Sequence, residues 1–85
     1  MEQTKSIAKR LVALRGALDI SAAAMCRTTG MTANRWSQYE NGGRRITLDA
    51  AVLLCEKYGV TLDWIYRGDE SGLPKRLMER LTIPA

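Results

Sequence analysis

Few residues in this 85-residue chain can carry covalent or acid–base chemistry. The chain contains no histidine and two cysteines, Cys26 and Cys55, which removes the usual zinc ligand sets and the Cys-His and Ser-His-Asp catalytic arrangements. Carboxylates, lysines and tyrosines are present, but no spaced pair of them suggests an active site. We therefore expect no enzymatic activity, no bound metal and no cofactor.

Side chains suited to hydrogen-bonded recognition gather instead in the segment 32–45. Asn34 and Gln38 carry amides that donate and accept at once, and Arg35 presents a planar fork of donors. Two further cations, Arg44 and Arg45, follow the amides. Taken alone, such a cluster is most simply a solvated polar face.

Charge and composition narrow the class of protein only slightly. Thirteen Lys and Arg against nine Asp and Glu give a formal net charge of +4, which suits a polyanionic partner but also occurs in proteins that bind none. With 46% hydrophobic and 26% charged residues, the chain has an ordinary globular composition, and its length predicts one domain.

The N-terminal segment, the absence of a long apolar run and the cysteines indicate the expected cellular location. Residues 1–7 are polar and lead into an amphipathic pattern, so we identify no signal peptide, and no apolar run reaches the length of a membrane span. The two cysteines lack the spacing of a disulfide framework. We expect a soluble cytoplasmic protein with reduced, core-filling thiols and no evident small-molecule ligand.

Apolar periodicity and capping residues predict the elements that hold the polar segment. The first helix has apolar residues at Ile7, Leu11, Leu14 and Leu18. Ser21 is a suitable N-cap for a second helix over 22–28 that Gly30 closes, and Thr32 for a third over 33–40 that Asn41-Gly42-Gly43 stops.

The remaining pattern adds three shorter helices. Thr47 caps a fourth helix, ended by Gly59, whose expected inward positions are Leu48, Ala51, Leu54, Cys55 and Tyr58. Thr61 caps a short fifth helix, residues 68–72 have linker composition, and Pro74 begins a last helix that continues through Leu81. With no strand-like alternation, the predicted fold class is all-α.

Residues 22–42, AAAMCRTTGMTANRWSQYENG, together with Val60-Thr61-Leu62-Asp63-Trp64, resemble the lambda-repressor and Cro family of helix-turn-helix proteins, also called the xenobiotic-response-element type. The resemblance covers roughly 11–68, and its densest part is Tyr39-Glu40-Asn41-Gly42, placed nine residues after Gly30. It implies a compact five-helix DNA-binding domain over 1–68, with the helix-turn-helix at about 22–40. The segment 69–85 would be a linker and a short extra C-terminal helix.

Carried over residue by residue, the resemblance implies contacts to base edges from Thr32, Ala33, Asn34, Arg35 and Gln38. The chemistry suits this role, because amides can bridge the N6 and N7 edge of adenine, Arg can fork onto guanine, and a methyl group can meet that of thymine.

The same resemblance implies phosphate contacts from Asn41, Arg44 and Arg45, against the simpler alternative of a solvated loop. It also implies an ion pair between Arg15 and Glu40 that braces the reading helix, against a solvated, unpaired Arg15. Lys5, Lys9 and Arg10 would extend the phosphate footprint, although a charged helix face is usually just solvated.

Three departures from the family pattern bear on binding. Ala22 stands where relatives usually carry a Gln that reaches a phosphate, so one anchor is missing. Trp36 takes a core position usually held by Ile or Val, and its indole N–H needs a partner. Thr28 and Thr29 replace a more usual charged residue and Leu, which loosens the apolar contact before the turn.

The resemblance implies a sequence-specific transcriptional regulator of bacterial or phage type, a repressor that inserts residues 32–41 into the major groove of double-stranded DNA as a homodimer. A dimer seam is expected on the fifth helix, at Trp64, Ile65 and Tyr66, or on the C-terminal helix. The alternative is a protein-interaction module, such as an antitoxin or anti-repressor domain, that uses the same fold.

Overall fold

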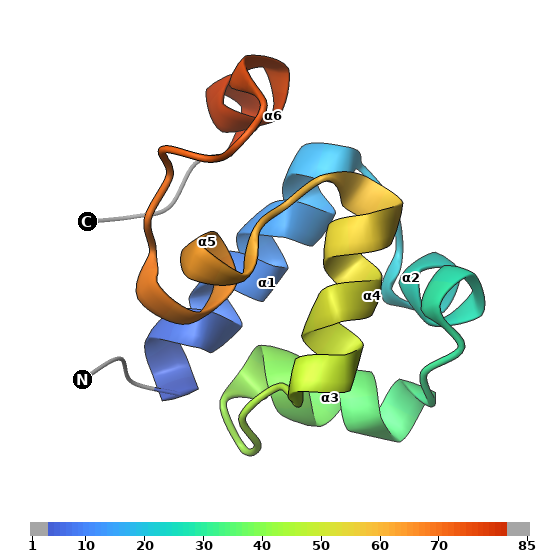
Figure 1. Cartoon of the computed structure of the whole chain (residues 1–85). Helices are drawn as coiled ribbons and strands as arrows, with labels where there is room; N and C mark the ends of the chain where they lie inside the picture. Colours follow the sequence, from blue (N-terminus) through green and yellow to red (C-terminus); the bar gives the residue numbers. More distant parts are fainter. Residues whose placement is uncertain (1–3, 82–85) are drawn as a thin grey trace.

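The computed structural model describes residues 4–81, and every regular element in that range is a helix (Figure 1). The all-α prediction is therefore confirmed for the described residues. The six helices are α1 (Thr4–Leu18), α2 (Ala22–Thr29), α3 (Ala33–Asn41), α4 (Leu48–Tyr58), α5 (Leu62–Arg67) and α6 (Lys75–Arg80).

Helices α2 to α5 share one pattern of termini. Each begins after a Ser or Thr whose hydroxyl oxygen accepts a hydrogen bond from a backbone N–H three residues later: Ser21, Thr32, Thr47 and Thr61. Each ends at a glycine in the left-handed conformation. Apart from Gly68, which was predicted only as part of a linker, these are the capping residues predicted from the sequence, although α2 and α3 each run one residue further than predicted.

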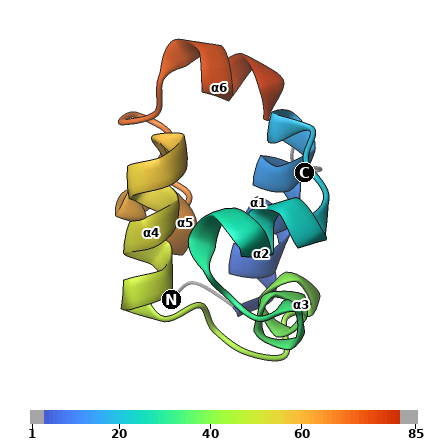
Figure 2. The same cartoon turned by 90° about the vertical axis from the view of Figure 1, so that its right-hand side faces the viewer.

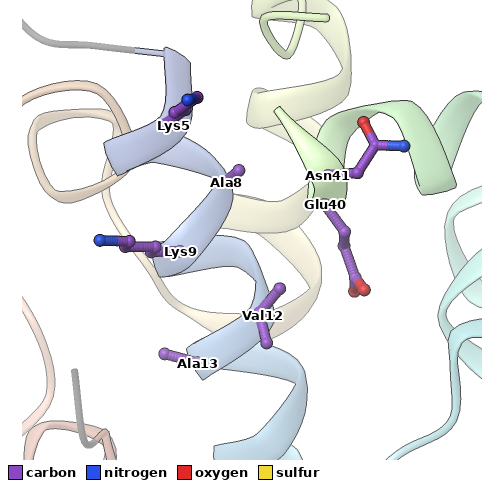
Figure 3. A pocket seen from close by; sticks show the side chains of 7 residues that line it. All are labelled: Lys5, Ala8, Lys9, Val12, Ala13, Glu40 and Asn41. Atoms are coloured by element: carbon purple, nitrogen blue, oxygen red, sulfur yellow. The ribbon is translucent and has the colours of Figure 1, made fainter. Parts of the chain in front are cut away.

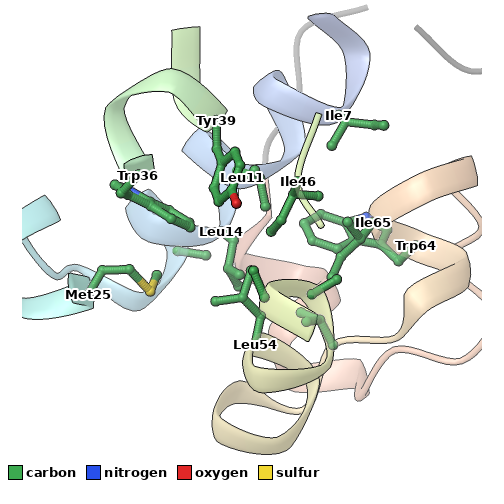
Figure 4. Packing of buried hydrophobic residues seen from close by; sticks show 14 of the residues in the cluster. Ile7, Leu11, Leu14, Met25, Trp36, Tyr39, Ile46, Leu54, Trp64 and Ile65 are labelled. Atoms are coloured by element: carbon green, nitrogen blue, oxygen red, sulfur yellow. The ribbon is translucent and has the colours of Figure 1, made fainter. Parts of the chain in front are cut away.

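The core lies between α1 and the other helices, with α1 in contact with α3 and α5, and α4 in contact with α2 and α5. Three large aromatic side chains, Trp36, Tyr39 and Trp64, are almost completely buried, and they pack with Leu11 and Leu54 (Figure 4). In a chain of this length, which buries roughly 60–65% of its unfolded surface, these aromatics supply much of the apolar burial.

One predicted inward position is wrong. Leu48 begins α4 with 59% of its surface exposed, whereas the buried arc of this helix consists of Ala50, Ala51 and Leu54. The sequence of α4 is apolar around most of its circumference, so periodicity alone did not fix the inward direction. Cys55 and Tyr58, also predicted inward, are half-buried against the core.

The last two helices have clear packing roles. Trp64 and Ile65 of α5 are fully buried, which makes them core residues and excludes them from a dimer seam. Leu73 and Leu77 are buried in the same core, so α6 covers it at the end of the molecule opposite α3 (Figure 2). Arg10 on α1 donates to the carbonyl of Ile65 at 3.0 Å and thus serves the α1–α5 contact.

Candidate nucleic-acid interface

Helices α2 and α3 are joined by a three-residue turn that fixes the direction of α3. Gly30 ends α2 with φ at 77°, and its N–H donates to the carbonyl of Cys26 at 2.8 Å. Thr32 then starts α3 by accepting the Arg35 N–H at 3.1 Å. Thr29, just before the turn, is buried, and its hydroxyl is satisfied by the Met25 carbonyl at 2.8 Å. The hydroxyl of the buried Thr29 therefore has a hydrogen-bond partner.

The two faces of α3 differ sharply. Trp36 and Tyr39 point into the core, where their rings meet edge to face with centroids 6.3 Å apart. The opposite face carries polar side chains at helical spacing, which are Asn34, Ser37, Gln38 and Asn41. We name these four residues the polar stripe. Gln38 is half-buried and the other three are exposed.

Not all of the predicted reading residues share this stripe. Ala33 lies on one flank, where it lines a hollow with Ala22 and Ala23, and Arg35 lies on the other flank, beside Asp49 of α4. Thr32 is exposed, but its hydroxyl oxygen is used by the cap. Of the five predicted positions, only Asn34 and Gln38 belong to the stripe.

Ser37 belongs to the stripe but was absent from the sequence-based assignment. Its spacing contained the signal, because Ser37 follows Asn34 by three residues and precedes Asn41 by four. A hydroxyl at the centre of an exposed helical face can donate to or accept from a base edge.

A compact group of hydrogen bonds fixes the C-terminal half of α3. The Glu40 carboxylate accepts from Arg15 Nε at 2.7 Å and Nη2 at 3.2 Å, and from the indole Nε1 of Trp36 at 2.7 Å. Arg15 also donates to the Ile20 carbonyl at 3.3 Å. The bond to Glu40 raises the pKa of Arg15, against the opposing effect of burial. We call Arg15, Trp36 and Glu40 the brace, since they link α1, the turn after it and α3.

The loop after α3 is held by the end of the helix. Asn41 Oδ1 accepts from the Gly43 N–H at 2.8 Å, and the Gln38 carbonyl accepts from the N–H groups of Gly43 and Arg44 at 3.0 and 3.2 Å. The oxygen of the Asn41 amide is therefore engaged, and its NH₂ group is the part that can donate to a ligand. The side chains of Arg44 and Arg45 are exposed.

A shallow groove of about 410 Å³ lies between α1 and the end of α3 (Figure 3). Its apolar part consists of Ala8, Val12 and Ala13, and Val12 is 44% exposed. The two exposed lysines of α1, Lys5 and Lys9, border it, and the Cγ of Lys5 would lie 3.4 Å from a Cβ at Gly42. Lys5 thus lies beside the loop after α3, whereas Lys9 lies one turn further along α1 with its side chain directed away from α3 (Figure 3), and Arg10 turns toward α5.

No helix within residues 4–81 is long and apolar enough to cross a membrane. The same residues contain no group of three or more Cys, Asp or Glu that could hold a metal ion.

Comparison with known protein families identifies the arrangement of α2, the turn and α3 as a helix-turn-helix. A family model described as a helix-turn-helix domain matches residues 6–64, which is most of the chain and includes the whole of α2, the turn and α3. This is a family of DNA-binding domains. Searches among curated proteins and among solved structures found no match.

Proposed function

Because the chain belongs to the helix-turn-helix domain family, we propose that it is a sequence-specific transcriptional repressor that inserts α3 into the major groove of double-stranded DNA. The groove is about 12 Å wide and admits one helix. The chain represses transcription by occupying an operator. As a regulator of bacterial or phage type, it binds DNA in the cytoplasm. The regulator acts as a homodimer, since one reading helix of this size covers only a few base pairs.

The observation that carries this proposal is the polar stripe on a braced helix. Asn34, Ser37 and Gln38 present hydrogen-bonding groups outward, while Trp36 and Tyr39 anchor the opposite face of α3 in the core. Side chains on a rigid element can discriminate bases at about 1–3 kcal/mol for each well-formed bidentate pair.

Basic residues lie near the polar stripe, and none of them belongs to it. Arg44 and Arg45 follow α3, and Lys5 and Lys9 stand beside its C-terminal end. Contacts from these residues to phosphate, together with the Asn41 amide, set the register of α3 in the groove and supply salt-dependent affinity. Arg35 lies on the flank of α3 that faces α4, so we expect it to contact only the edge of the major groove of DNA.

Selection of bound sequences from random DNA duplexes tests the proposal. We expect one enriched motif in two symmetric halves for the native chain, and a relaxed motif for Asn34→Ala with Gln38→Ala, because two readers are removed. Ser37→Ala should relax a single position. An unchanged motif in the double variant would refute the assignment of these readers, and no enrichment with the native chain would refute sequence-specific binding.

A salt titration tests the phosphate contacts separately. Arg44→Ala with Arg45→Ala should weaken binding to all sequences alike and reduce the slope of log Kobs against log salt by about 1–2. The control is Arg76→Ala with Arg80→Ala, which removes the same charge from exposed positions on α6, at the far end of the molecule. Equal slopes for the two variants would show that net charge alone acts.

The groove between α1 and α3 favours a second candidate function, that of a protein-interaction module. Val12 is exposed beside Ala8 and Ala13, and these methyl groups offer no donor to a phosphate. Val12→Asp distinguishes the two functions. It should abolish binding to a protein partner seated in the groove, while a DNA-binding regulator should keep its enriched motif.

A further inference from the structure

We propose that the groove between α1 and α3 binds an acidic amphipathic helix of another protein, and that this helix and DNA exclude each other. The inference deepens the proposed function and rests on it in one respect, which is that α3 reads DNA. The chemical class of the partner follows from the lining, the shape and the charge of the groove.

Two neighbouring hollows make up the binding surface. The first is the groove of about 410 Å³ that Lys5 and Lys9 border, and the second, of about 390 Å³, lies between α1, α2 and α3. Val12, Glu40 and Asn41 line both of them, so the two hollows are continuous. We name them together the α1–α3 groove.

The floor of the α1–α3 groove consists of small apolar side chains from three helices. They are Ala8, Val12 and Ala13 of α1, Ala22 and Ala23 of α2, and Ala33 of α3. Val12 has 44% of its surface exposed, and the three alanines of the second hollow are exposed as well. Methyl groups in a hollow leave room for larger side chains of a partner, such as Leu or Phe. A contiguous exposed apolar patch with polar residues at its border is typical of an interaction surface.

The partner element that suits this floor is a helix. Every regular element within residues 4–81 is a helix, so the described part of the chain offers no sheet edge to which an extended peptide could add a strand. Methyl groups supply no hydrogen bonds either, whereas a helix satisfies its own backbone N–H and C=O groups. From Lys5 to Val12, α1 advances about 10 Å at about 1.5 Å per residue, which is enough to lie along about two turns of a partner helix.

The shape of the groove is unsuited to a small molecule. Binding sites for small molecules surround most of the surface of the ligand. The α1–α3 groove is shallow and open along α1 (Figure 3), so a small apolar ligand would keep much of its surface in water. A protein helix needs only one apolar side covered, because its other side packs on the rest of the partner.

The charges at the groove favour an acidic partner. Lys5 and Lys9 are exposed and four residues apart on α1, and Lys9 stands at the border away from α3 (Figure 3). The carboxylate that lines the groove, that of Glu40, is paired with Arg15 at 2.7 Å, so it does not cancel the charge of the lysines. Acidic residues on the flanks of a partner helix would therefore meet positive charge, while the apolar row between them contacts Val12.

A helix in the groove and DNA compete for the same residues. Ser37 and Asn41 of the polar stripe line the second hollow, so a helix seated there covers two of the four residues of the stripe. The lysines that we assign to phosphate contacts would be engaged by carboxylates of the partner. A protein bound in the α1–α3 groove would therefore release the operator, and DNA would weaken the binding of that protein by the same factor.

Selection from a displayed library of helical peptides tests the inference on the full chain. The peptides have about 18 residues, or about five helical turns, with one face and its flanks randomised. We expect enriched peptides with large apolar residues four and three positions apart, flanked by Asp or Glu. Enrichment of basic peptides, or of none, would overturn the inference. The enriched peptide that binds most tightly is then the probe in titrations followed by fluorescence anisotropy.

Variants of the chain locate the bound probe. Val12→Asp should weaken binding of the probe at least about tenfold, because a carboxylate would be buried against its apolar row. The matched control is Val52→Asp on α4, at a side chain that is 37% exposed and lines neither hollow, and it should bind like the native chain. Lys5→Glu with Lys9→Glu should reject the probe and bind a second peptide in which Lys replaces each acidic residue. Unchanged unfolding curves of all variants show that the fold is intact.

Three results of these titrations would overturn the inference. They are equal affinity of the probe for the native chain and for Val12→Asp, no binding of the Lys-containing peptide to the charge-reversed variant, and a shift of the Val12 methyl signals in NMR spectra by decanoate where the probe causes none. The last result would assign the groove to a small amphipathic anion.

Competition with DNA separates the inference from the proposed function. On a duplex of the enriched motif, the probe should release the native chain and Val52→Asp but not Val12→Asp. Simultaneous binding of probe and duplex would refute the exclusion. A chain that binds the probe in the groove but enriches no DNA motif would retain the helix-binding site and refute the regulator. A chain that enriches a motif and binds no peptide would do the reverse.

Discussion

Replacing Glu40 tests whether the brace holds α3 in place. In Glu40→Ala the indole N–H of Trp36 loses its acceptor, and Trp36 is almost fully buried, so that water cannot replace the bond. An unsatisfied buried donor costs about 1–3 kcal/mol. Arg15 retains 29% exposure of its side chain and can be hydrated, so loss of the ion pair adds at most about 1 kcal/mol.

The free energy of unfolding should therefore fall by about 1–4 kcal/mol, which at its upper end is a large part of the total for a domain of this size. The midpoint of thermal unfolding, followed by circular dichroism, should fall by about 5–30 °C. Glu40→Gln keeps an acceptor for the indole and loses only the charge, so we expect about 1 kcal/mol. A double-mutant cycle with Trp36→Phe isolates the indole bond, because the cost of Glu40→Ala should shrink when the donor is absent.

Two outcomes would refute this reasoning. If Glu40→Ala unfolds within about 0.5 kcal/mol of the native chain, the brace contributes nothing measurable. If Glu40→Gln is as unstable as Glu40→Ala, the charge on Arg15 matters and the indole does not.

Four further predictions concern single residues. Gly30→Ala should destabilise by about 1–2 kcal/mol because φ is 77° there, whereas Gly16→Ala, in α1 with open space around it, should stabilise by about 0.5–1 kcal/mol; urea unfolding of both tests the backbone argument. Tyr66→Phe should cost about 0.5–1.5 kcal/mol, whereas Tyr58→Phe should cost nothing, because the buried Tyr58 hydroxyl has no hydrogen-bond partner among residues 4–81. Burial raises the pKa of Tyr66 above its ordinary value of about 10, so its stabilisation is complete below pH 10 and is lost as the pH rises through the folded value; unfolding from pH 8 to 12 should show a smaller alkaline loss in Tyr66→Phe. Ala22→Gln should tighten DNA binding about fivefold at unchanged salt slope, since it adds a neutral phosphate contact, and an equal gain from Ala23→Gln would show that position within α2 is irrelevant.

Helix termini could be predicted from the sequence because they depend on local chemistry. The hydroxyl of Thr32 and the left-handed Gly30 act within a few residues of their own positions, and no distant contact is needed to specify them. The need of Trp36 for a hydrogen-bond partner was also evident, and Glu40, one helical turn later, supplies it.

Packing directions could not be predicted in the same way. The outward position of Leu48 and the turning of Arg10 toward Ile65 depend on where α5 lies, which neither residue's neighbours in sequence determine. The half-exposed Val12 and Val52 are likewise apolar residues that periodicity assigns to no face. The exposure of these two apolar residues therefore emerged only from the tertiary structure.

On the proposed function, the structure divides recognition of DNA between two chemically different sets of residues. The polar stripe is neutral, so its hydrogen bonds can discriminate bases but release few counterions. Lys5, Lys9 and Arg44 lie around the stripe, and their charges add affinity without regard to sequence. Because Ala22 stands where relatives carry a phosphate-binding Gln on α2, we expect the phosphate contacts to come from the loop after α3 and the start of α1. Raising the salt concentration should therefore lower affinity for every sequence while the enriched motif stays the same.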